Sequence, residues 1–467
     1  MFEKIKAVIK RMLDAKDVQK VVNQSIGMSS EMRTAINDWA MIYKNSPPWA
    51  IRKENILRLL NLGKAISKEL ARLVLLECKV RVDNCETVDA VMQNVFKDIR
   101  PHFEKALAKG GMALKPYISH SGNVEVDFVD AENFFPIGYD SNGDIYAAIF
   151  VSKLLYKEEY YTRLEKHEYS YQTKSEHIQN FAFRSKSPDA LGTQISLSSV
   201  PAWSMLTSEA TVSGIDSPLF AYFKVPFANT IDDESPLGVS VFEDSIDLLE
   251  DADRQYTRYL WEYEGGELAI DANIDMLKSV NEDDESGVEY DFVMPEHQGR
   301  LFRRFGGYNN SGEPFYKEFA PELRDSSYAN GLETILRRIE FNSSLAYGTL
   351  SRVDNVDKTA EEIKASKQRS YAAVAEIQTA LQTACERLAY DILYWQQLKG
   401  ENVNISELNM TYTWDDSIIR DSQRELAERL QLQTAGVIKP WENRAWYLGE
   451  SEDKAKKMCQ PSDEFFE

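Results

Sequence analysis

Cysteine is scarce in this chain of 467 residues, and its four cysteines form no C-x-x-C pair. Cysteines placed in this way do not make a disulfide framework, so we expect free thiols and synthesis in a reducing compartment such as the cytoplasm. They are Cys78, Cys85, Cys385 and Cys459.

Long apolar runs are absent as well. No stretch is long and apolar enough to cross a bilayer, and charged residues interrupt the N-terminus where a signal peptide would need an apolar region. Phe2, Ile5, Ile9 and Leu13 share one helical face, which suits either an anionic membrane surface or docking onto a soluble fold. We favour docking, and we predict neither export nor a membrane partner.

Residues typical of catalysis are few. The chain has five histidines, none with the spacing of zinc ligands, and no G-x-x-x-x-G-K-[ST] phosphate loop. We therefore predict no enzyme and no cofactor. The histidines are His102, His120, His167, His177 and His297.

Two motifs imitate metal sites. Asp140, Asn142 and Asp144 resemble the start of a calcium loop, but glycine stands at the fourth position and Val151 at the twelfth, so a hairpin turn is the better interpretation. Asp357 with Glu362 and Lys364 resembles a magnesium nuclease signature. That signature needs a strand, whereas here a helix is expected, so we interpret it as a helix cap and a solvated face.

Basic charge is in deficit. Asp and Glu number 75 against 54 Lys and Arg, a net charge of −21. Because proteins that grip DNA do so by placing basic side chains on phosphates, tight binding to nucleic acid is not expected.

Glycine and proline are missing between Thr349 and Lys399, and apolar residues recur there every three or four positions. This pattern predicts one helix from Thr359 to Gln397, roughly 60 Å long, begun by a capping box of Thr359 and Glu362. A helix of that length must pack against something extended. Its apolar face contains Ile363, Val374, Ile377, Leu381, Leu388, Ile392 and Trp395.

The first half of the chain, with 43% hydrophobic residues overall, changes from helical to strand periodicity. We predict helices from Ser29 or Ser30 to about Ser46, from Lys53 to Glu77, and from Val88 to Lys109 with Gly110 as C-cap. Antiparallel strands follow to about Phe227. They are expected at 124–128, 145–152, 160–164 and 167–172, with turns at Ser141–Gly143 and Glu165–Lys166, and 184–217 is expected to be a surface loop.

The second half has the order helix, β insertion, helix. One helix is expected from Ser235–Pro236 to Gly265–Gly266, then short strands to Tyr328, then a helix over 329–345 and a non-helical stretch around Gly348. After Gly400 we expect a strand at 408–414, helices at 418–435 and 439–447, and a charged tail. The length suits about three domains, and the fold class predicted is α+β.

Several strings in this same order carry a resemblance. They are GGMALKPY at 110–117, SPLGVSVF at 235–242, FAPELRDSSYANGLETILRRIEFNSSLAYGTLS at 319–351, KTAEEI at 358–363, and the segments 36–49, 71–77, 414–418 and 447–450. Together they resemble the portal proteins of tailed bacteriophages, in particular those of long-tailed phages of Gram-positive hosts.

The resemblance implies a portal fold with parts that follow one another along the chain. Residues 1–234 would form a wing, helical over 29–110 and antiparallel β over 122–227. Residues 235–264 and 329–345 would be two stem helices, and residues 265–328 between them a small clip. Residues 346–357 would be a tunnel loop, residues 358–400 a long wing helix, and residues 401–467 a short helical crown with the C-terminal tail.

It also implies a function. Portal subunits form a ring, usually of twelve, at one vertex of the capsid in the virion, assembled in the host cytoplasm. Double-stranded DNA passes through it without specific binding during packaging and ejection. The clip would dock the terminase large subunit and later a head-completion adaptor, and the ring would meet the major capsid and scaffold proteins.

Two groups of residues would line the passage. The tunnel-loop group is Tyr347, Gly348, Thr349, Leu350, Ser351, Arg352 and Val353, with Arg352 as the loop's one basic side chain. Tyr347, Leu350 and Val353 are expected to pack between neighbouring loops. The acidic stem group is Glu243, Asp244, Asp247, Glu250, Asp251 and Asp253, whose carboxylates would keep a duplex from pairing with the walls. An ordinary solvated helix face is the alternative for this second group.

Two other functions fit less well. A non-conducting head or tail structural oligomer would not need an acidic stem followed by a loop. A DNA-packaging enzyme such as a terminase would need the phosphate loop that the chain lacks.

Overall fold

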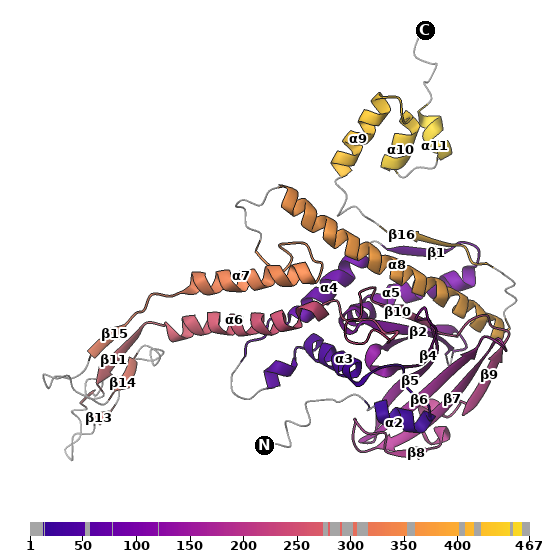
Figure 1. The fold of residues 1–467 in the computed structure, drawn as a ribbon, viewed down its shortest axis with the longest axis horizontal. Coiled ribbons are helices and arrows are strands. Elements are labelled where there is room, and N and C mark those ends of the chain that lie inside the picture. The colour runs from indigo at the N-terminus through magenta and orange to yellow at the C-terminus, as the bar shows by residue number, and fades with distance from the viewer. Residues whose placement is uncertain are drawn as a thin grey trace, which may run out of the picture.

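Two long helices, α5 (Glu86–Lys109) and α8 (Ala360–Leu398), pack on antiparallel sheets to form the body of an α+β protein (Figure 1). The computed structural model describes residues 13, 15–51, 57–76, 78–119, 121–273, 279–280, 290–291, 302–305, 316–352, 360–400, 407–414, 422–448 and 452–459. None of the helices in these ranges has the length and apolar character that a bilayer crossing requires.

Two sheets build the body. One has the order β10-β2-β3, and the other has the order β4-β5-β6-β7-β8 with β9 also paired to β7; every pairing in both is antiparallel. Helix α8 lies on β10 and β2, and α5 on β3 and β2. The strands are β2 (Gly111–Ile118), β3 (Val124–Asp130), β4 (Phe134–Tyr139), β5 (Ile145–Tyr156), β6 (Glu159–Ser170), β7 (Ser175–Ser185), β8 (Thr193–Ile195), β9 (Glu209–Ser213) and β10 (Ala221–Lys224).

The predicted apolar face of the long helix is confirmed. Val374, Ile377, Leu381, Leu388 and Ile392 of α8 are all buried in the main core, and Trp395 packs against it. The same core takes in α3 (Ser30–Tyr43), α4 (Leu62–Val74) and α5. Helix α8, which is long for a compact domain, therefore packs along the main core of the body.

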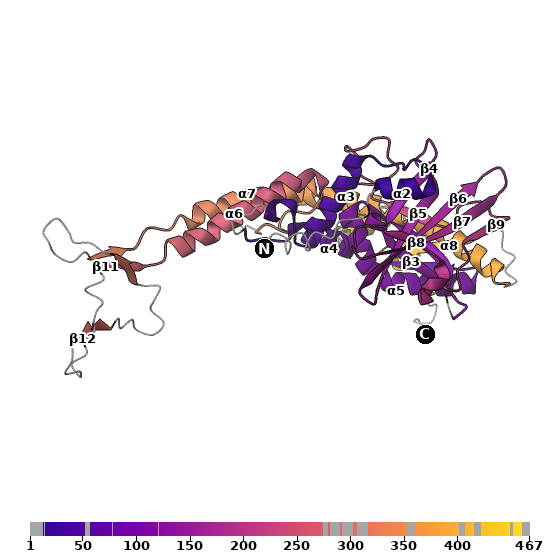
Figure 2. The same cartoon turned by 90° about the horizontal axis from the view of Figure 1, so that it is seen from below.

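An arm leaves the body. Helices α6 (Ile246–Gly265) and α7 (Asp325–Asn342) run antiparallel and carry small strands at their far end (Figure 2). There β11 (Ala269–Asn273) pairs in parallel with β14 (Phe302–Phe305) and antiparallel with β15 (Tyr316–Phe319), and β12 (Ser279–Val280) pairs with β13 (Tyr290–Asp291). The predicted order of helix, β insertion and helix is confirmed.

The C-terminal region begins with a strand that returns to the body. Strand β16 (Met410–Thr413) pairs antiparallel with β1 (Lys79–Val82), which precedes α5. Helices α9 (Ser422–Thr434), α10 (Pro440–Leu448) and α11 (Glu452–Met458) form a separate group (Figure 1). The first two match the predicted helices, and the third lies where only a charged tail was expected. Near the N-terminus, helix α2 (Ala15–Val22) covers the six-stranded sheet.

Several local predictions are confirmed by backbone geometry. The hydroxyl of Ser29 accepts from the amide of Met32 and caps α3, and Gly110 ends α5 at φ +89°. Asp140 Oδ1 accepts from the amides of Asn142 and Asp144 at 2.8 and 3.0 Å, so this segment is a hairpin turn. All four cysteines are free thiols. Residues 2–12 and Thr359, on which other predictions depend, lie outside the described residues.

The predicted helix from Lys53 to Glu77 is wrong at its start. Residues 57–61 are neither helix nor strand, and α4 begins only at Leu62, after Asn61 adopts φ +56°. Residues 53–56 lie outside the described residues. The reason is tertiary: the amides of Arg58 and Leu60 donate to side chains of α6, which holds the segment straight along that helix. We call residues 57–60 the strap.

The predicted turn at Glu165–Lys166 is also wrong, because β6 continues through it. Both side chains are nearly buried, with Glu165 paired to Lys115 and Arg163 and Lys166 paired to Glu168. Two adjacent charged residues suggested an exposed turn. In the structure these ion pairs neutralise both side chains, so the strand can continue through them. The real turns lie at Lys157–Glu158, both with positive φ, and at 171–174.

The predicted loop over 184–217 contains structure. Strands β8 and β9 pair with different parts of the outer edge of β7, at 182–184 and 175–179 respectively. Between them Leu197, Val200 and Trp203 bury their side chains in a small core. Strands of three and five residues are too short to show a period in the sequence.

The two helices predicted as the stem have different bounds from those expected. Helix α6 starts at Ile246 after a 3-10 turn (Glu243–Ser245), ten residues later than Pro236, and α7 spans Asp325–Asn342 in place of 329–345. The segment before α6 instead crosses the end of α5, where the amide of Val241 donates to the carbonyl of Leu107 at 3.0 Å. A Cβ on Gly238 would lie 2.3 Å from the carbonyl oxygen of Gly110, so this crossing requires glycine.

Candidate functional site

The two helices of the arm are held in a fixed antiparallel register. Near the body, Asn342 Nδ2 donates to the carbonyl of Asp244 at 2.8 Å, and midway Gln255 Nε2 donates to the carbonyl of Tyr328 at 3.2 Å. At the far end, Arg324 binds the carboxylate of Glu262 through its guanidinium at 2.8 Å and its amide at 3.0 Å. Contacts along the whole length make the pair one rod.

Two carboxylates of the predicted acidic stem turn inward and attach this rod to the body. Glu243 accepts from the indole of Trp39 in α3. Asp253, 5% exposed, accepts from the indole of Trp49 at 3.0 Å and from the amide of Leu60 at 2.8 Å. Desolvation raises the pKa of both carboxyls. Because both carboxylates face the body, neither the lining of an open passage nor an ordinary solvated face describes them.

The other four carboxylates lie on the surface or near it. Asp244, Asp247 and Asp251 are exposed along one face of the helix, and half-buried Glu250 forms an ion pair with Arg254. The same exposed face continues with Arg254 and Arg258 at helical spacing. The face is therefore acidic next to the body and basic farther out, a division that the sequence-based grouping did not anticipate.

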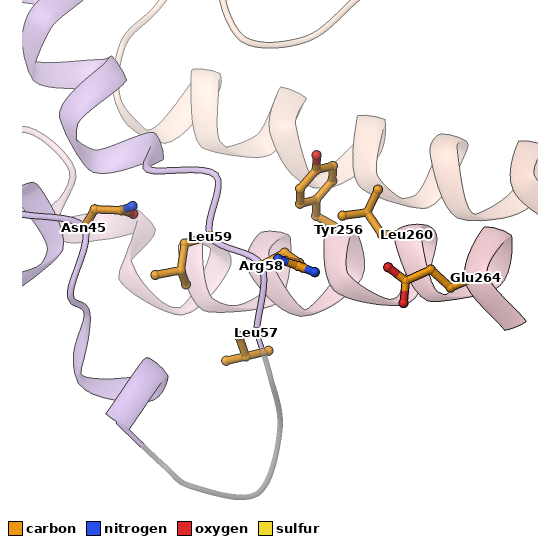
Figure 3. Close-up of a pocket in the computed structure, with 7 residues that line it drawn as sticks. All are labelled: Asn45, Leu57, Arg58, Leu59, Tyr256, Leu260 and Glu264. Carbon is orange, nitrogen blue, oxygen red and sulfur yellow. The ribbon is translucent and has the colours of Figure 1, made fainter. Parts of the chain in front are cut away.

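The strap makes a groove on the flank of α6. Arg58 donates its amide to Thr257 Oγ1 at 2.9 Å, so the strap follows the helix for more than one turn. The groove has a volume of about 570 Å³, with apolar side chains between the charges of Arg58 and Glu264 (Figure 3). Its lining residues are Asn45, Leu57, Arg58, Leu59, Tyr256, Leu260 and Glu264.

Helix α7 ends in a Schellman motif without glycine. The amide of Leu345 donates to the carbonyl of Glu340 at 2.8 Å, the amide of Ser344 donates to that of Phe341 at 3.3 Å, and Ser344 has φ +56°. Leu345 is fully buried beneath this turn. The chain is thereby turned sharply away from the helix axis.

Residues 346–352, which we call the connector, then fold back on α7. The carboxylate of Glu340, fully buried, accepts from the amides of Gly348, Leu350 and Ser351 at 3.1, 2.6 and 2.9 Å. It also accepts from Ser351 Oγ at 2.8 Å. Amides of one short segment that converge on one anion resemble a backbone nest, here around a carboxylate of the same chain.

The remaining predicted loop residues have different surroundings. The guanidinium of Arg369 in α8 lies 5.2 Å from the ring centroid of Tyr347. Leu350 packs against the main core of the same chain. Thr349 and Arg352 are exposed, and the amide of Arg352 donates to Glu333 at 2.6 Å. Val353 lies outside the described residues. The structure thus brings the connector and α7 together.

Glu340 was missed by sequence reasoning, although a signal was present. It follows Leu336 by four positions and therefore falls on the apolar side of the helix, where a carboxylate must find donors. The nearest donors along the chain are in the loop that contains Gly348 and Ser351.

The described residues hold no cluster of histidine, cysteine, aspartate or glutamate that fits a metal ion. The backbone at 362–364 is helical. Asp357 lies outside the described residues, as do the side chains of Glu362 and Lys364. The nuclease signature needs a strand at that place.

Known proteins resemble this chain at the level of family and fold. Two solved structures are similar at a TM-score of 0.43. One is a chain of the virion of a native gene transfer agent particle, at 12% identity over 84% of this chain and 91% of that one. The other belongs to the neck of that kind of particle, computed with C12 symmetry, at 11% identity over 93% and 98%. No curated protein matches. Residues 89–444, well over half of the chain, match the family of phage portal proteins described as SPP1 Gp6-like, and the protein therefore belongs to that family.

Proposed function

We propose that copies of this chain assemble into a ring of about twelve at one vertex of a phage capsid, and that double-stranded DNA passes through it during packaging and ejection. The observation that carries this proposal is the rigid α6–α7 arm in a chain of the portal family. Rods that repeat around an axis close into a ring through heterologous contacts between neighbours.

In this proposal the acidic stem faces the passage through Asp244, Asp247 and Asp251, which are exposed beside the body. Carboxylates there deny phosphates the ion pairs that would retain a duplex, so DNA slides past without specific binding. Glu243 and Asp253 have another task, because they hold the arm to Trp39 and Trp49. The connector would border the same passage with the exposed side chains of Thr349 and Arg352.

The strands at the far end of the arm lie away from the body and are therefore suited to docking other proteins (Figure 1). We propose that this clip, residues 265–328, binds the terminase large subunit during packaging and a head-completion adaptor afterwards. The body would form the wing that meets the major capsid and scaffold proteins, and residues 401–467 the crown. The assembled ring would be part of the virion.

The mass and image of the purified assembly test this proposal. A particle near twelve times 53.5 kDa with a central hole supports a conduit. A ring without a hole would favour a non-conducting structural oligomer. Because assembly can require the capsid, the same measurement is made on particles recovered from infected cells, where persistence as a monomer would contradict the proposal.

A further inference from the structure

Among the described residues, the connector makes more hydrogen bonds to α7 than to α8. Four hydrogen bonds join Gly348, Leu350 and Ser351 to the single carboxylate of Glu340 in α7. A fifth joins the amide of Arg352 to Glu333. Glu333 and Glu340 are seven residues apart, two helical turns, so both acceptors lie on the same side of α7.

The contact with α8 is of a different kind. Arg369 donates from Nη2 to the carbonyl of Leu345 at 3.3 Å, and its guanidinium lies 4.5 Å from the ring centroid of Phe341. The same guanidinium lies 5.2 Å from the ring centroid of Tyr347 in the connector. In the described part of the chain, these polar and ring contacts with α8 converge on one arginine, upstream of the residues that Glu340 holds. A displacement of α8 relative to α7 can therefore be absorbed at one arginine side chain, whereas the nest must break before Gly348–Ser351 separates from α7.

We infer that Glu340 is a positioning residue: its carboxylate makes the connector and stem helix α7 a single moving unit. The consequence for DNA rests on the proposed function, since only in a conduit would Thr349 and Arg352 be presented to a duplex at a height set by α7. The tie itself does not depend on that function.

The burial of Glu340 explains why the tie persists. A carboxylate removed from water needs several donors, and the connector supplies all four that the structure records for it. The connector turns at Gly348, which has φ +91°, and three of its amides then point toward Glu340, while that of Thr349 donates to the carbonyl of Ala346. The connector donors thus satisfy the hydrogen-bonding needs of the buried carboxylate, and the carboxylate satisfies theirs.

Hydrogen exchange of the isolated chain tests the tie. Glu340→Ala should speed exchange at the amides of Gly348, Leu350 and Ser351 by about tenfold or more, the factor expected when bonds to a charged group are lost. Glu340→Gln keeps the acceptor oxygen and should stay within about threefold of the wild type. Glu376→Ala, an exposed acid on α8, is the matched control and should change none of these amides.

Unchanged exchange in Glu340→Ala would overturn the inference, as would equal acceleration throughout α7 and α8. If Glu340→Ala does not fold, Ser351→Ala serves instead, because it removes one donor without leaving the carboxylate unpaired. Faster exchange limited to the connector amides then supports the tie, and no change contradicts it.

The second arm of the experiment measures DNA packaging by assembled rings. Glu340→Ala should form rings and package several-fold less DNA, and Glu340→Gln should recover most of the loss. Packaging equal to wild type would overturn the positioning role even where exchange is faster. Absence of a wild-type ring with a hole is a different result, since it contradicts the proposed function and leaves the exchange experiment intact.

Discussion

The indole nitrogen of Trp49 donates a 3.0 Å hydrogen bond to Asp253 Oδ2, which joins the 3-10 turn before the strap to the middle of α6. The other oxygen of Asp253 accepts from the amide of Leu60 in the strap. One buried carboxylate therefore fixes two separate segments of the body to the arm. Asp253, together with Glu243, therefore attaches the arm to the body.

Asp253→Ala should lower the free energy of unfolding by about 2–4 kcal/mol, because it leaves two buried N–H groups without acceptors. Urea denaturation of the isolated chain measures the change. Asp251→Ala, two residues away and exposed, should stay within about 0.5 kcal/mol of the wild type. A similar loss in both variants would mean that the helix, and not the contact with Trp49 and Leu60, is being weakened.

Gly110→Ala tests the crossing of Gly238 over the end of α5. Gly110 has φ +89°, and a Cβ there would lie 2.2 Å from the carbonyl oxygen of Gly238. The free energy of unfolding should fall by about 3 kcal/mol or more, because the backbone at Gly238 must shift and residue 110 must keep a strained conformation. Gly122→Ala supplies the control, with φ +78° and open space around it.

Gly122→Ala should lower the free energy of unfolding by about 1 kcal/mol, because only the backbone conformation is strained. Thermal denaturation of both variants gives the comparison. Equal losses would show that the close approach of the two glycine backbones contributes nothing beyond the positive φ.

Much of the fold could be predicted because the deciding interactions are local. The Ser29 cap, the Gly110 stop and the apolar face of α8 each depend on neighbours within a few residues. The strap could not be predicted, because helix α6, about 200 residues away, supplies the acceptors that hold residues 57–60 out of a helix. Its sequence has helical periodicity, and tertiary contacts override it.

The candidate site shows the same division. The sequence pattern predicts a non-helical stretch around Gly348 and an acidic run at Glu243–Asp253, whereas their place beside a passage came from the family resemblance alone. Glu340 and the inward turn of Asp253 were missed, because a carboxylate in the sequence carries no mark of whether its partners are water or amides. Glu165 led to a false turn for that reason too, since its partner Lys115 is on another strand.

His167 gives a prediction for pH. Burial alone would lower its pKa, but Glu176 at 2.5 Å and Glu165 at 3.1 Å bind its two ring nitrogens and raise the pKa above the ordinary value of 6.5. A raised pKa in the folded state stabilises the protein below pH 6.5, and this contribution is lost as the pH rises through the folded-state value.

The free energy of unfolding should therefore fall above pH 6.5 by up to about 1.4 kcal/mol per pH unit until His167 is neutral. Denaturant titrations at a series of pH values measure the slope. In His167→Gln the slope should be much reduced, whereas His177→Gln on the adjacent strand should keep it. Retention of the full slope in His167→Gln would assign it to another group.

Arg352→Ala tests the one basic side chain of the connector. Its amide, not its side chain, binds Glu333, so the backbone should keep its position in the variant. Rings should assemble normally while packaging slows several-fold, if the guanidinium contacts phosphates in passing. Arg352→Lys keeps the charge and should slow packaging less. Disassembly of Arg352→Ala rings would instead indicate that the side chain holds neighbouring subunits together.

The acidic stem leads to a prediction about salt. Replacing Asp244, Asp247 and Asp251 by lysine should stall DNA in the conduit, because each lysine on a phosphate adds affinity through counterion release. That affinity falls steeply with salt, so raising the salt concentration should restore passage. Single-particle measurements of packaging rate at low and high salt would show both effects.

Replacing the same three residues by asparagine separates the loss of the carboxylates from the gain of positive charge. It removes the carboxylates without adding a cation, so it should slow passage little, and its rate should depend weakly on salt. Arg258→Ala removes a base from the outer half of the same face and should not slow passage at low salt. If the lysine and asparagine variants behave alike, these carboxylates do not face the duplex, and the exposed face of α6 belongs to a contact between subunits.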